Sequence, residues 1–175
     1  MGVDGFRLDA VKHIYHNANS DENPTFLKKF YDHCDATFKS VGGKGEFYMV
    51  GEQFSDAAEV APYYKGIPAL FEFSFWWRLK DCINSGDGSS FVGTIQGYQK
   101  LYSGYRLDYI EATKLSNHDE DRVGSDLGKN VDKMKLAGAV LLTAGGQPYI
   151  YQGEELGYWG TKSGGDEYVR TPILW

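Results

Sequence analysis

The sequence has few cysteines and no long apolar run, and both absences narrow what the chain can be. Cys34 and Cys82 are the two cysteines, and they form no Cys-x-x-Cys pair, so we expect two free, buried thiols. No apolar stretch reaches the roughly 18–20 residues that span a bilayer. No positively charged start leads into an apolar segment, as it would in a signal peptide. We therefore expect no membrane span in this chain.

Basic clusters and phosphate-binding motifs are also absent from the sequence. The formal net charge is −6, and no run of lysine or arginine would follow a phosphate backbone, so nucleic acid is not an expected partner. No Gly-x-Gly-x-x-Gly follows a predicted strand, and there is no P-loop. The 175 residues, of which 42% are hydrophobic, suffice for one ordinary domain with a sizeable core.

Short apolar strands alternate with amphipathic helices along the chain. We predict strands at 2–9, 47–51, 69–73, 110–115 and 148–151, and helices at 23–38, 55–64, within 73–102 and at 131–143. Asn23 is expected to cap the first helix, with Pro24 after it, and Ser55 the second. The alternation predicts an α/β fold with a parallel sheet covered by helices. Five strands are more than half of an eight-stranded barrel, and a doubly wound open sheet is the alternative.

Three of the predicted strands end beside a carboxylate. Arg7 and Asp9 share one face of the first strand, and the guanidinium favours the ionised carboxylate that a nucleophile requires. Glu52 directly follows the second strand, where partial desolvation suits a general acid. Asn117-His118-Asp119 follows the fourth strand. Each motif alone is compatible with an ion pair or a polar loop, but their recurrence at strand ends favours an active site.

An acid and a nucleophile, both carboxyl groups, are what glycoside hydrolysis with retention of configuration requires. The reaction passes through a covalent glycosyl–enzyme intermediate, and the bond-breaking step needs no metal.

These motifs match a known family. The run from Gly5 to His13 (Gly-Phe-Arg-Leu-Asp-Ala-Val-Lys-His) resembles the second conserved region of glycoside hydrolase family 13, the alpha-amylase family. Gly51-Glu52 resembles the third region, and Leu-Ser-Asn-His-Asp at 115–119 resembles the fourth. The closing Arg-Thr-Pro-Ile-Leu-Trp at 170–175 resembles the segment after the last barrel strand. The motifs stand in the family's order and cover the whole chain.

The resemblance implies a fold and a place in a larger protein. The expected fold is α/β, a partial TIM (β/α)8 barrel comprising strands 4 to 8 of the catalytic domain. Residues 1–175 are then expected to be the C-terminal part of the catalytic barrel. On this interpretation the chain is a fragment without the first strands, the inserted domain and the C-terminal β-sandwich of the family.

The resemblance also implies catalytic roles. Asp9 would be the nucleophile, oriented by Arg7. Glu52 would be the general acid and then the general base. Asp119 would bind sugar hydroxyls and favour the distorted ring of the transition state.

Further residues would hold the substrate by the same resemblance. His118 and Asn117 would bind the sugar before the cleaved bond, and Lys12 and His13 would line the leaving-group side. In many members the backbone carbonyl at the position of His13 also ligates a structural calcium, so calcium is the expected cofactor of the full-length parent.

Within the family, three runs are similar to cell-surface starch-degrading amylases of gut bacteria: 9–16, 61–66 and 153–157. They favour an alpha-amylase or neopullulanase that acts on alpha-1,4-glucan (starch, maltooligosaccharides), outside or on the surface of a bacterium. An alpha-glucosidase or a transglycosylase would use the same carboxylates, and a non-catalytic glucan-binding member is a further alternative.

Overall fold

The computed structural model describes residues 2–174, which form two compact units. Unit 1 consists of residues 2–72 and 96–112, and unit 2 consists of residues 73–95 and 113–174. The chain therefore passes from one unit to the other three times.

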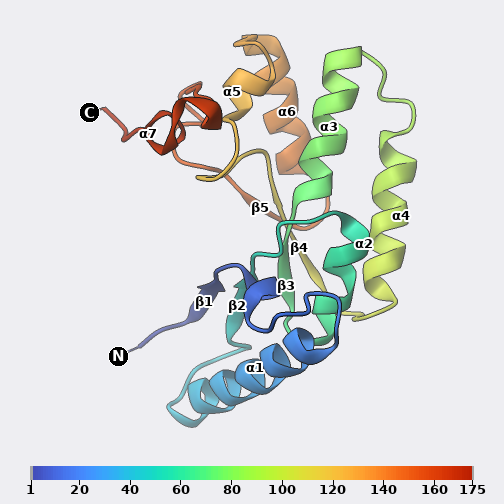
Figure 1. Ribbon diagram of the computed structural model, residues 1–175, viewed down its shortest axis with the longest axis vertical. Coiled ribbons are helices and arrows are strands. Elements are labelled where there is room, and N and C mark those ends of the chain that lie inside the picture. Colours follow the sequence, from blue (N-terminus) through green and yellow to red (C-terminus); the bar gives the residue numbers. More distant parts are fainter. Residues whose placement is uncertain (1, 175) are drawn as a thin grey trace. The chain divides into compact units, whose positions relative to one another are not determined.

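Five strands follow one another in the sheet in chain order (Figure 1). They are β1 (Gly5–Leu8), β2 (Tyr48–Gly51), β3 (Ala69–Glu72), β4 (Ile110–Lys114) and β5 (Gln147–Tyr149). β1 pairs in parallel with β2, and β2 with β3, with Gly5 opposite Tyr48 and Val50 opposite Ala69. Parallel neighbours need crossover connections, most often helical, so the expected α/β class is confirmed. Each strand is shorter than predicted.

Unit 1 is built around the helix α1 (Glu22–Ser40). Leu27, Tyr31, Cys34 and Phe38 recur at intervals of four, three and four residues, which places them on one face of the helix. That face contributes to a core that also contains Met49 of β2. Three short helices complete the unit: η1 (Val11–His13), α2 (Ala57–Val60) and η2 (Ala61–Lys65).

Both predicted helix caps in unit 1 are wrong. α1 begins at Glu22, and Asn23 lies inside it with a fully buried side chain that accepts from the Tyr15 N–H at 2.8 Å and donates to the Lys12 carbonyl at 3.0 Å. Asn23 therefore ties the loop after β1 to the helix. The cap of α2 is Asp56, one residue after Ser55, and it accepts from the N–H groups of Ala58 and Glu59.

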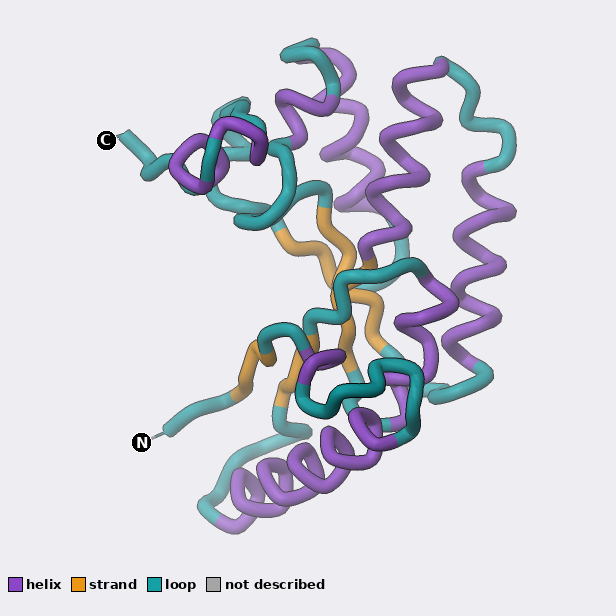
Figure 2. The backbone as a smooth tube through the Cα atoms, in the orientation of Figure 1, coloured by secondary structure: helices purple, strands orange, loops and turns teal. Residues whose placement is uncertain are grey.

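Unit 2 contains the helices α3 (Phe73–Ser85), α5 (Val123–Asp126), α6 (Val131–Thr143), η3 (Lys162–Gly164) and α7 (Asp166–Val169). α4 (Phe91–Ser103) begins in unit 2 and ends in unit 1. The core of unit 2 joins α3 to α6, with Trp76 and Leu79 against Ala137 and Leu141. Figure 2 shows the long loops that follow β4 and β5.

The two cysteines are free thiols, as expected, although Cys34 is only half-buried while Cys82 is buried. Among residues 2–174, no helix combines the length and the apolar character that crossing a membrane would require.

Candidate active site

The ends of β1 and β2 are tied together beyond the last strand residues. The N–H of Glu52 donates to the Leu8 carbonyl at 2.9 Å, and the N–H of Val11 donates to the Glu52 carbonyl at 2.9 Å. Between them, Ala10 adopts a left-handed conformation with φ 40° and ψ 51°, which L-residues with a Cβ avoid at a cost of about 1 kcal/mol. This turn fixes the backbone of Asp9 against that of Glu52.

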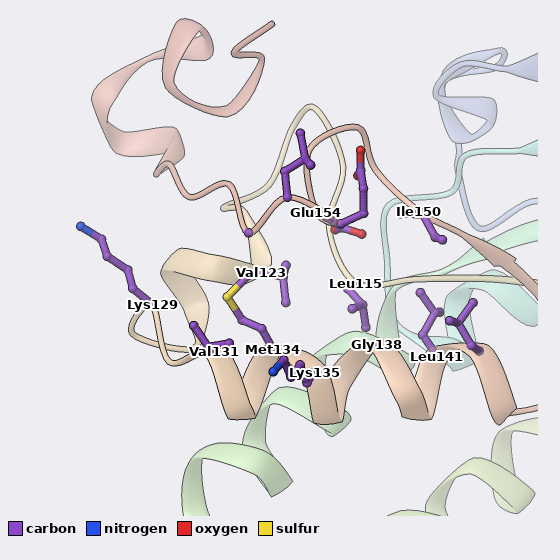
Figure 3. Close-up of a pocket in the computed structure, with 14 residues that line it drawn as sticks. Leu115, Val123, Lys129, Val131, Met134, Lys135, Gly138, Leu141, Ile150 and Glu154 are labelled. Atoms are coloured by element: carbon purple, nitrogen blue, oxygen red, sulfur yellow. The ribbon is translucent and has the colours of Figure 1, made fainter. Parts of the chain in front are cut away.

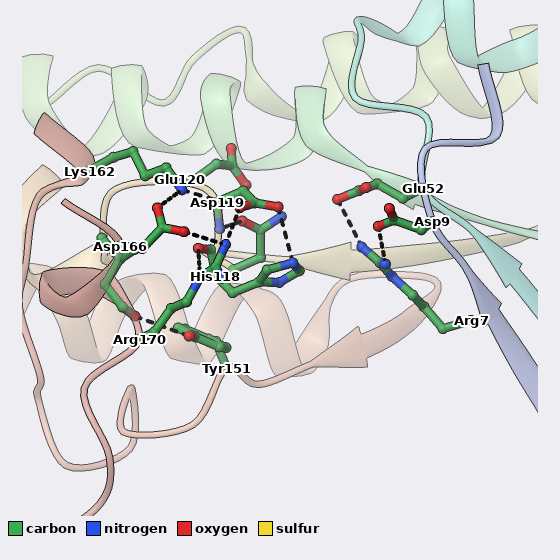
Figure 4. A network of polar contacts seen from close by, with 12 residues as sticks. Arg7, Asp9, Glu52, His118, Asp119, Glu120, Tyr151, Lys162, Asp166 and Arg170 are labelled. Atoms are coloured by element: carbon green, nitrogen blue, oxygen red, sulfur yellow. Dashed lines mark hydrogen bonds and ion pairs between the residues drawn. The ribbon is translucent and has the colours of Figure 1, made fainter. Parts of the chain in front are cut away.

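A single guanidinium connects the two carboxylates. Nη1 of Arg7 forms a short ion pair with Oδ1 of Asp9, and Nη2 lies 3.1 Å from Oε1 of Glu52 (Figure 4). The side chain of Glu52 is 10% exposed and that of Asp9 is 76% exposed. The expected group of Arg7, Asp9 and Glu52 is therefore assembled in unit 1, with one carboxyl group enclosed and the other open.

Gly51 makes room for this arrangement. A Cβ at Gly51 would lie 2.6 Å from Cδ1 of Ile67 and 3.2 Å from Cγ1 of Val11. A larger residue would push the strand end that carries Glu52 away from its neighbours.

Lys12 and His13 lie in η1, directly after the turn at Ala10. The ammonium group of Lys12 donates to the Phe54 carbonyl at 2.7 Å, which spans the loops after β1 and β2. His13 is exposed. Lys12 thus has a bracing role in unit 1, and its contact with a sugar stays a prediction.

The second group of predicted residues lies in unit 2, in the loop after β4. Oδ1 of Asn117 accepts from the Asp119 N–H at 2.8 Å, so the Asn117 side chain shapes the turn that presents Asp119. Nε2 of His118 lies 3.0 Å from Oδ2 of Asp119. The structure brings these three residues together as a compact polar turn.

Two cations that were not among the predicted site residues hold Asp119. Nζ of Lys162 lies 3.2 Å and Nη2 of Arg170 2.9 Å from Oδ1 of Asp119, and Nε of Arg170 donates to the His118 carbonyl at 3.1 Å (Figure 4). Both cations lie more than 40 positions further along the chain, so no local pattern links them to Asp119. The resemblance of 170–175 to a family segment was the one signal that pointed to this region.

These contacts set the charge of Asp119. Burial by itself raises the pKa of the carboxyl group, but the hydrogen bonds from Lys162 and Arg170 and the nearby His118 outweigh it. The pKa of Asp119 therefore lies below its usual value, and the group is a carboxylate at neutral pH.

A buried polar layer supports the loop that carries Asp119. The buried Lys114 forms a short ion pair with Glu120, and the Ser116 hydroxyl donates a short hydrogen bond to Glu154. Arg122 is fully buried, and its Nη1 donates to the Gln152 carbonyl at 2.8 Å. Burial raises the pKa of Glu154 to about 7, because the hydrogen bonds from Ser116 and the Tyr151 N–H and the charge of Lys114 offset desolvation only in part.

A pocket of about 490 Å³ lies in unit 2, beside this layer (Figure 3). Its walls are mostly apolar and come from α6 and from the loops after β4 and β5, including Leu115, Met134, Leu141 and Ile150. None of the predicted site residues lines it, so the pocket is separate from the carboxylate chemistry.

The side chains of residues 2–174 do not make a calcium site by themselves. Among residues 2–174, no three or more side chains of His, Cys, Asp or Glu are grouped so that they could hold a metal ion. Calcium takes six to eight oxygen ligands, and the carbonyl of His13 would supply one of them. Calcium at His13 stays a prediction.

The fold and the carboxylates define the class of protein. A parallel α/β sheet that presents two carboxyl groups, joined by one guanidinium, at the ends of adjacent strands has the pair of groups that glycoside hydrolases use. The chain belongs to the alpha-amylase family, because the family's catalytic-domain model (Alpha amylase, catalytic domain) matches residues 1–175.

Known relatives agree with this assignment. The chain is 64% identical over 174 residues to alpha-amylase SusG of Bacteroides thetaiotaomicron, covering 99% of this chain and 25% of SusG. It is 37% identical to alpha-amylase 3 of Dictyoglomus thermophilum, covering 99% of this chain and 33% of that protein. The crystal structure of the alpha-amylase from H. orenii matches with a TM-score of 0.84 and 34% identity, covering 99% and 34% of the two chains. The fold is thus a partial barrel of an alpha-amylase catalytic domain, and the chain spans a quarter to a third of the length of these relatives.

Proposed function

We propose that this chain carries the catalytic carboxylates of a retaining glycoside hydrolase that cleaves alpha-1,4-glucosidic bonds in starch and maltooligosaccharides. One observation carries the proposal: Arg7 forms ion pairs with both Asp9 and Glu52 where β1 and β2 end. Family membership supports the substrate class, because the two relatives named above are alpha-amylases.

In the first step, the carboxylate of Asp9 attacks the anomeric carbon of the sugar. Glu52 gives its proton to the glycosidic oxygen, so the bond to the leaving sugar breaks and a covalent glycosyl–Asp9 ester forms. Asp9 suits this role because its side chain is open to an approaching sugar and is oriented by its ion pair with Arg7. The enclosed position of Glu52 suits the proton donor.

In the second step, Glu52, now a carboxylate, takes a proton from a water molecule. The water oxygen attacks the anomeric carbon and displaces Asp9, which returns the enzyme to its starting state. Two displacements at the same carbon retain the configuration of the released sugar.

Asp119 and its neighbours bind the sugar ring whose glycosidic bond is cleaved. The ionised Asp119 would accept hydrogen bonds from sugar hydroxyls, and these bonds strengthen as the ring flattens. His118 and Asn117 would contact the same sugar, and Lys12 and His13 would face the leaving-group side. These roles rest on the family resemblance of the motifs.

Three finer assignments belong to the same proposal. The five strands would correspond to strands 4 to 8 of the eight-stranded family barrel. The full-length parent would act outside the cell or on the surface of a bacterium, and it would bind calcium through oxygens that include the His13 carbonyl. All three rest on the resemblance.

The acceptor in the second step separates closely related activities. Water gives hydrolysis, whereas a sugar hydroxyl in its place gives transglycosylation by the same carboxylates. The lengths of the products from a long maltooligosaccharide distinguish an endo-acting amylase from an alpha-glucosidase, which releases glucose first.

Reducing-sugar release from soluble starch by the full-length parent tests the proposal. We expect Glu52→Gln and Asp9→Asn each to lower turnover by roughly a thousandfold or more, whereas Glu155→Gln, at an exposed position of unit 2, leaves it unchanged. Near-normal turnover in either carboxylate variant would refute the assignment. Glucan binding by the full-length parent without any turnover would instead support a non-catalytic member of the family.

A further inference from the structure

The carboxylate of Asp119 has most of its hydrogen-bonding capacity taken by protein groups. Oδ1 is shared between Nζ of Lys162 at 3.2 Å and Nη2 of Arg170 at 2.9 Å, and Oδ2 faces Nε2 of His118 at 3.0 Å. A carboxylate offers about four lone-pair positions. Lys162, Arg170 and His118 face three of these positions on Asp119. The fourth is left for a sugar hydroxyl, and the three protein groups determine the direction in which it points.

Among these groups, Arg170 has a contact that the others lack. Its Nε donates to the His118 carbonyl at 3.1 Å while its Nη2 reaches Asp119, so one planar guanidinium holds both the main chain and the side chain of the loop. Its Nη2 also lies 2.8 Å from Oδ2 of Asp166, which anchors Arg170 to the short helix α7 that ends just before it. A lysine would supply the charge but not the rigid fork.

We propose that Arg170 is a positioning residue for Asp119, which it orients by binding the His118 carbonyl and the Asp119 carboxylate together. The proposal deepens the proposed function, on which its catalytic consequence rests. Its structural part concerns unit 2 alone and can be measured without any turnover.

The structural readout uses three variants of the full chain. Arg170→Ala removes the fork, Arg170→Lys keeps the charge without the fork, and Lys133→Ala removes a cation that contacts Asn84 elsewhere in unit 2. Hydrogen exchange reports on the Asp119 amide, whose partner is Asn117, and carboxyl NMR reports the titration of Asp119. We expect exchange at this amide to be roughly tenfold faster in both Arg170 variants and unchanged in Lys133→Ala. We expect the titration midpoint of Asp119 to rise in Arg170→Ala. In Arg170→Lys it should stay near its value in the unsubstituted chain.

The catalytic readout is the turnover of a maltooligosaccharide. A displaced Asp119 loses contacts that form fully in the transition state, so kcat should fall roughly 10- to 100-fold in both Arg170 variants while KM changes less than about threefold. Full recovery of kcat by Arg170→Lys would show that only the charge matters and would overturn the positioning role.

The outcomes separate the two proposals. If neither the full-length parent nor any variant of it cleaves glucan, the proposed function fails, and exchange and titration decide the role of Arg170. Parental exchange at Asp119 in both Arg170 variants overturns the inference, as does equal acceleration in Lys133→Ala. If Arg170→Ala loses its fold, Arg170→Lys gives the decisive comparison.

Discussion

Nη2 of Arg7 lies 3.1 Å from Oε1 of Glu52, while the same guanidinium is ion-paired with Asp9. Two carboxyl groups that are proposed for opposite roles in one reaction thus share one cation. Because the guanidinium is planar and has a fixed geometry, it sets the direction of both side chains at once.

Replacing Arg7 with methionine should therefore abolish most activity with little loss of stability. We expect kcat/KM on a maltooligosaccharide to fall roughly 100-fold, because the two carboxyl groups lose the group that orients them. The free energy of unfolding should change by about 1 kcal/mol at most, since the ion pair is partly exposed. Lys28→Ala, which breaks the exposed pair with Asp32, is the control and should leave kcat/KM at the parental value. Half or more of parental turnover in the Arg7 variant would contradict the shared-cation arrangement.

Two glutamates, Glu111, which is buried, and Glu154, which is half-buried, should make stability depend on pH. Burial raises the pKa of Glu154 in unit 2 and of Glu111 in unit 1 to about 7 each, above the usual glutamate value of 4.5. A carboxyl group whose pKa is higher in the folded chain binds its proton more tightly there. The free energy of unfolding should therefore decline as pH rises from about 4.5 to about 7, and the contribution of each group to this decline is on the order of 3 kcal/mol at most.

Urea unfolding at several pH values tests this linkage. Glu154→Gln and Glu111→Gln should each flatten the decline, because the amide does not ionise. Glu155→Gln is exposed and should leave the pH profile as it is in the parent. If the pH dependence of unfolding were unchanged in both Glu154→Gln and Glu111→Gln, these carboxyl groups would ionise as easily in the folded chain as in the unfolded one.

Two glycines in unit 2 should respond oppositely to alanine. A Cβ at Gly160 would collide with the main-chain carbonyl of Tyr168, which cannot move away as a flexible side chain could. We expect Gly160→Ala to lower the free energy of unfolding by about 3 kcal/mol. A Cβ at Gly138 in α6 meets nothing within 4 Å, so Gly138→Ala should raise it by up to about 1 kcal/mol. If the two alanine variants had the same melting temperature, the close packing of Tyr168 against Gly160 would be contradicted.

The cap of α2 gives a test that separates the structure from the sequence pattern. Asp56 accepts from two N–H groups at 2.9 and 3.1 Å, and Ser55 does not cap the helix. Asp56→Ala should destabilise the chain by about 1 kcal/mol, and Ser55→Ala should have a smaller effect. If Ser55→Ala lowered the denaturant midpoint more than Asp56→Ala does, Ser55 would be the cap of α2, as the sequence suggested.

Elements with strong local signals were predictable from the sequence. α6 runs from Val131 to Thr143, as predicted, because Asn130 caps it through the N–H groups of Asp132 and Lys133 and glycines follow its end. The strands were also found, since short apolar runs between turns identify them. α5, η3 and α7 are only three or four residues long, and long-range contacts rather than a periodic pattern define them.

The supports of the candidate site were less predictable than its carboxylates. Asp9, Glu52 and Asp119 follow strands, so their positions could be inferred from local order. Lys162 and Arg170 contact Asp119 across separations of 43 and 51 positions, and such pairs leave no trace in a single sequence. Asn23 shows the same limit, because a typical capping residue is instead used in a buried contact between loop and helix.

The order in which the chain visits its two units has a consequence for inheritance. Residues 73–95 belong to unit 2 but are encoded between two parts of unit 1, so neither unit corresponds to one uninterrupted stretch of gene. A crossover or truncation within residues 73–112 would break both units at once. A chimaera that exchanges one whole unit and keeps the other therefore needs three junctions, one at each point where the chain passes between the units.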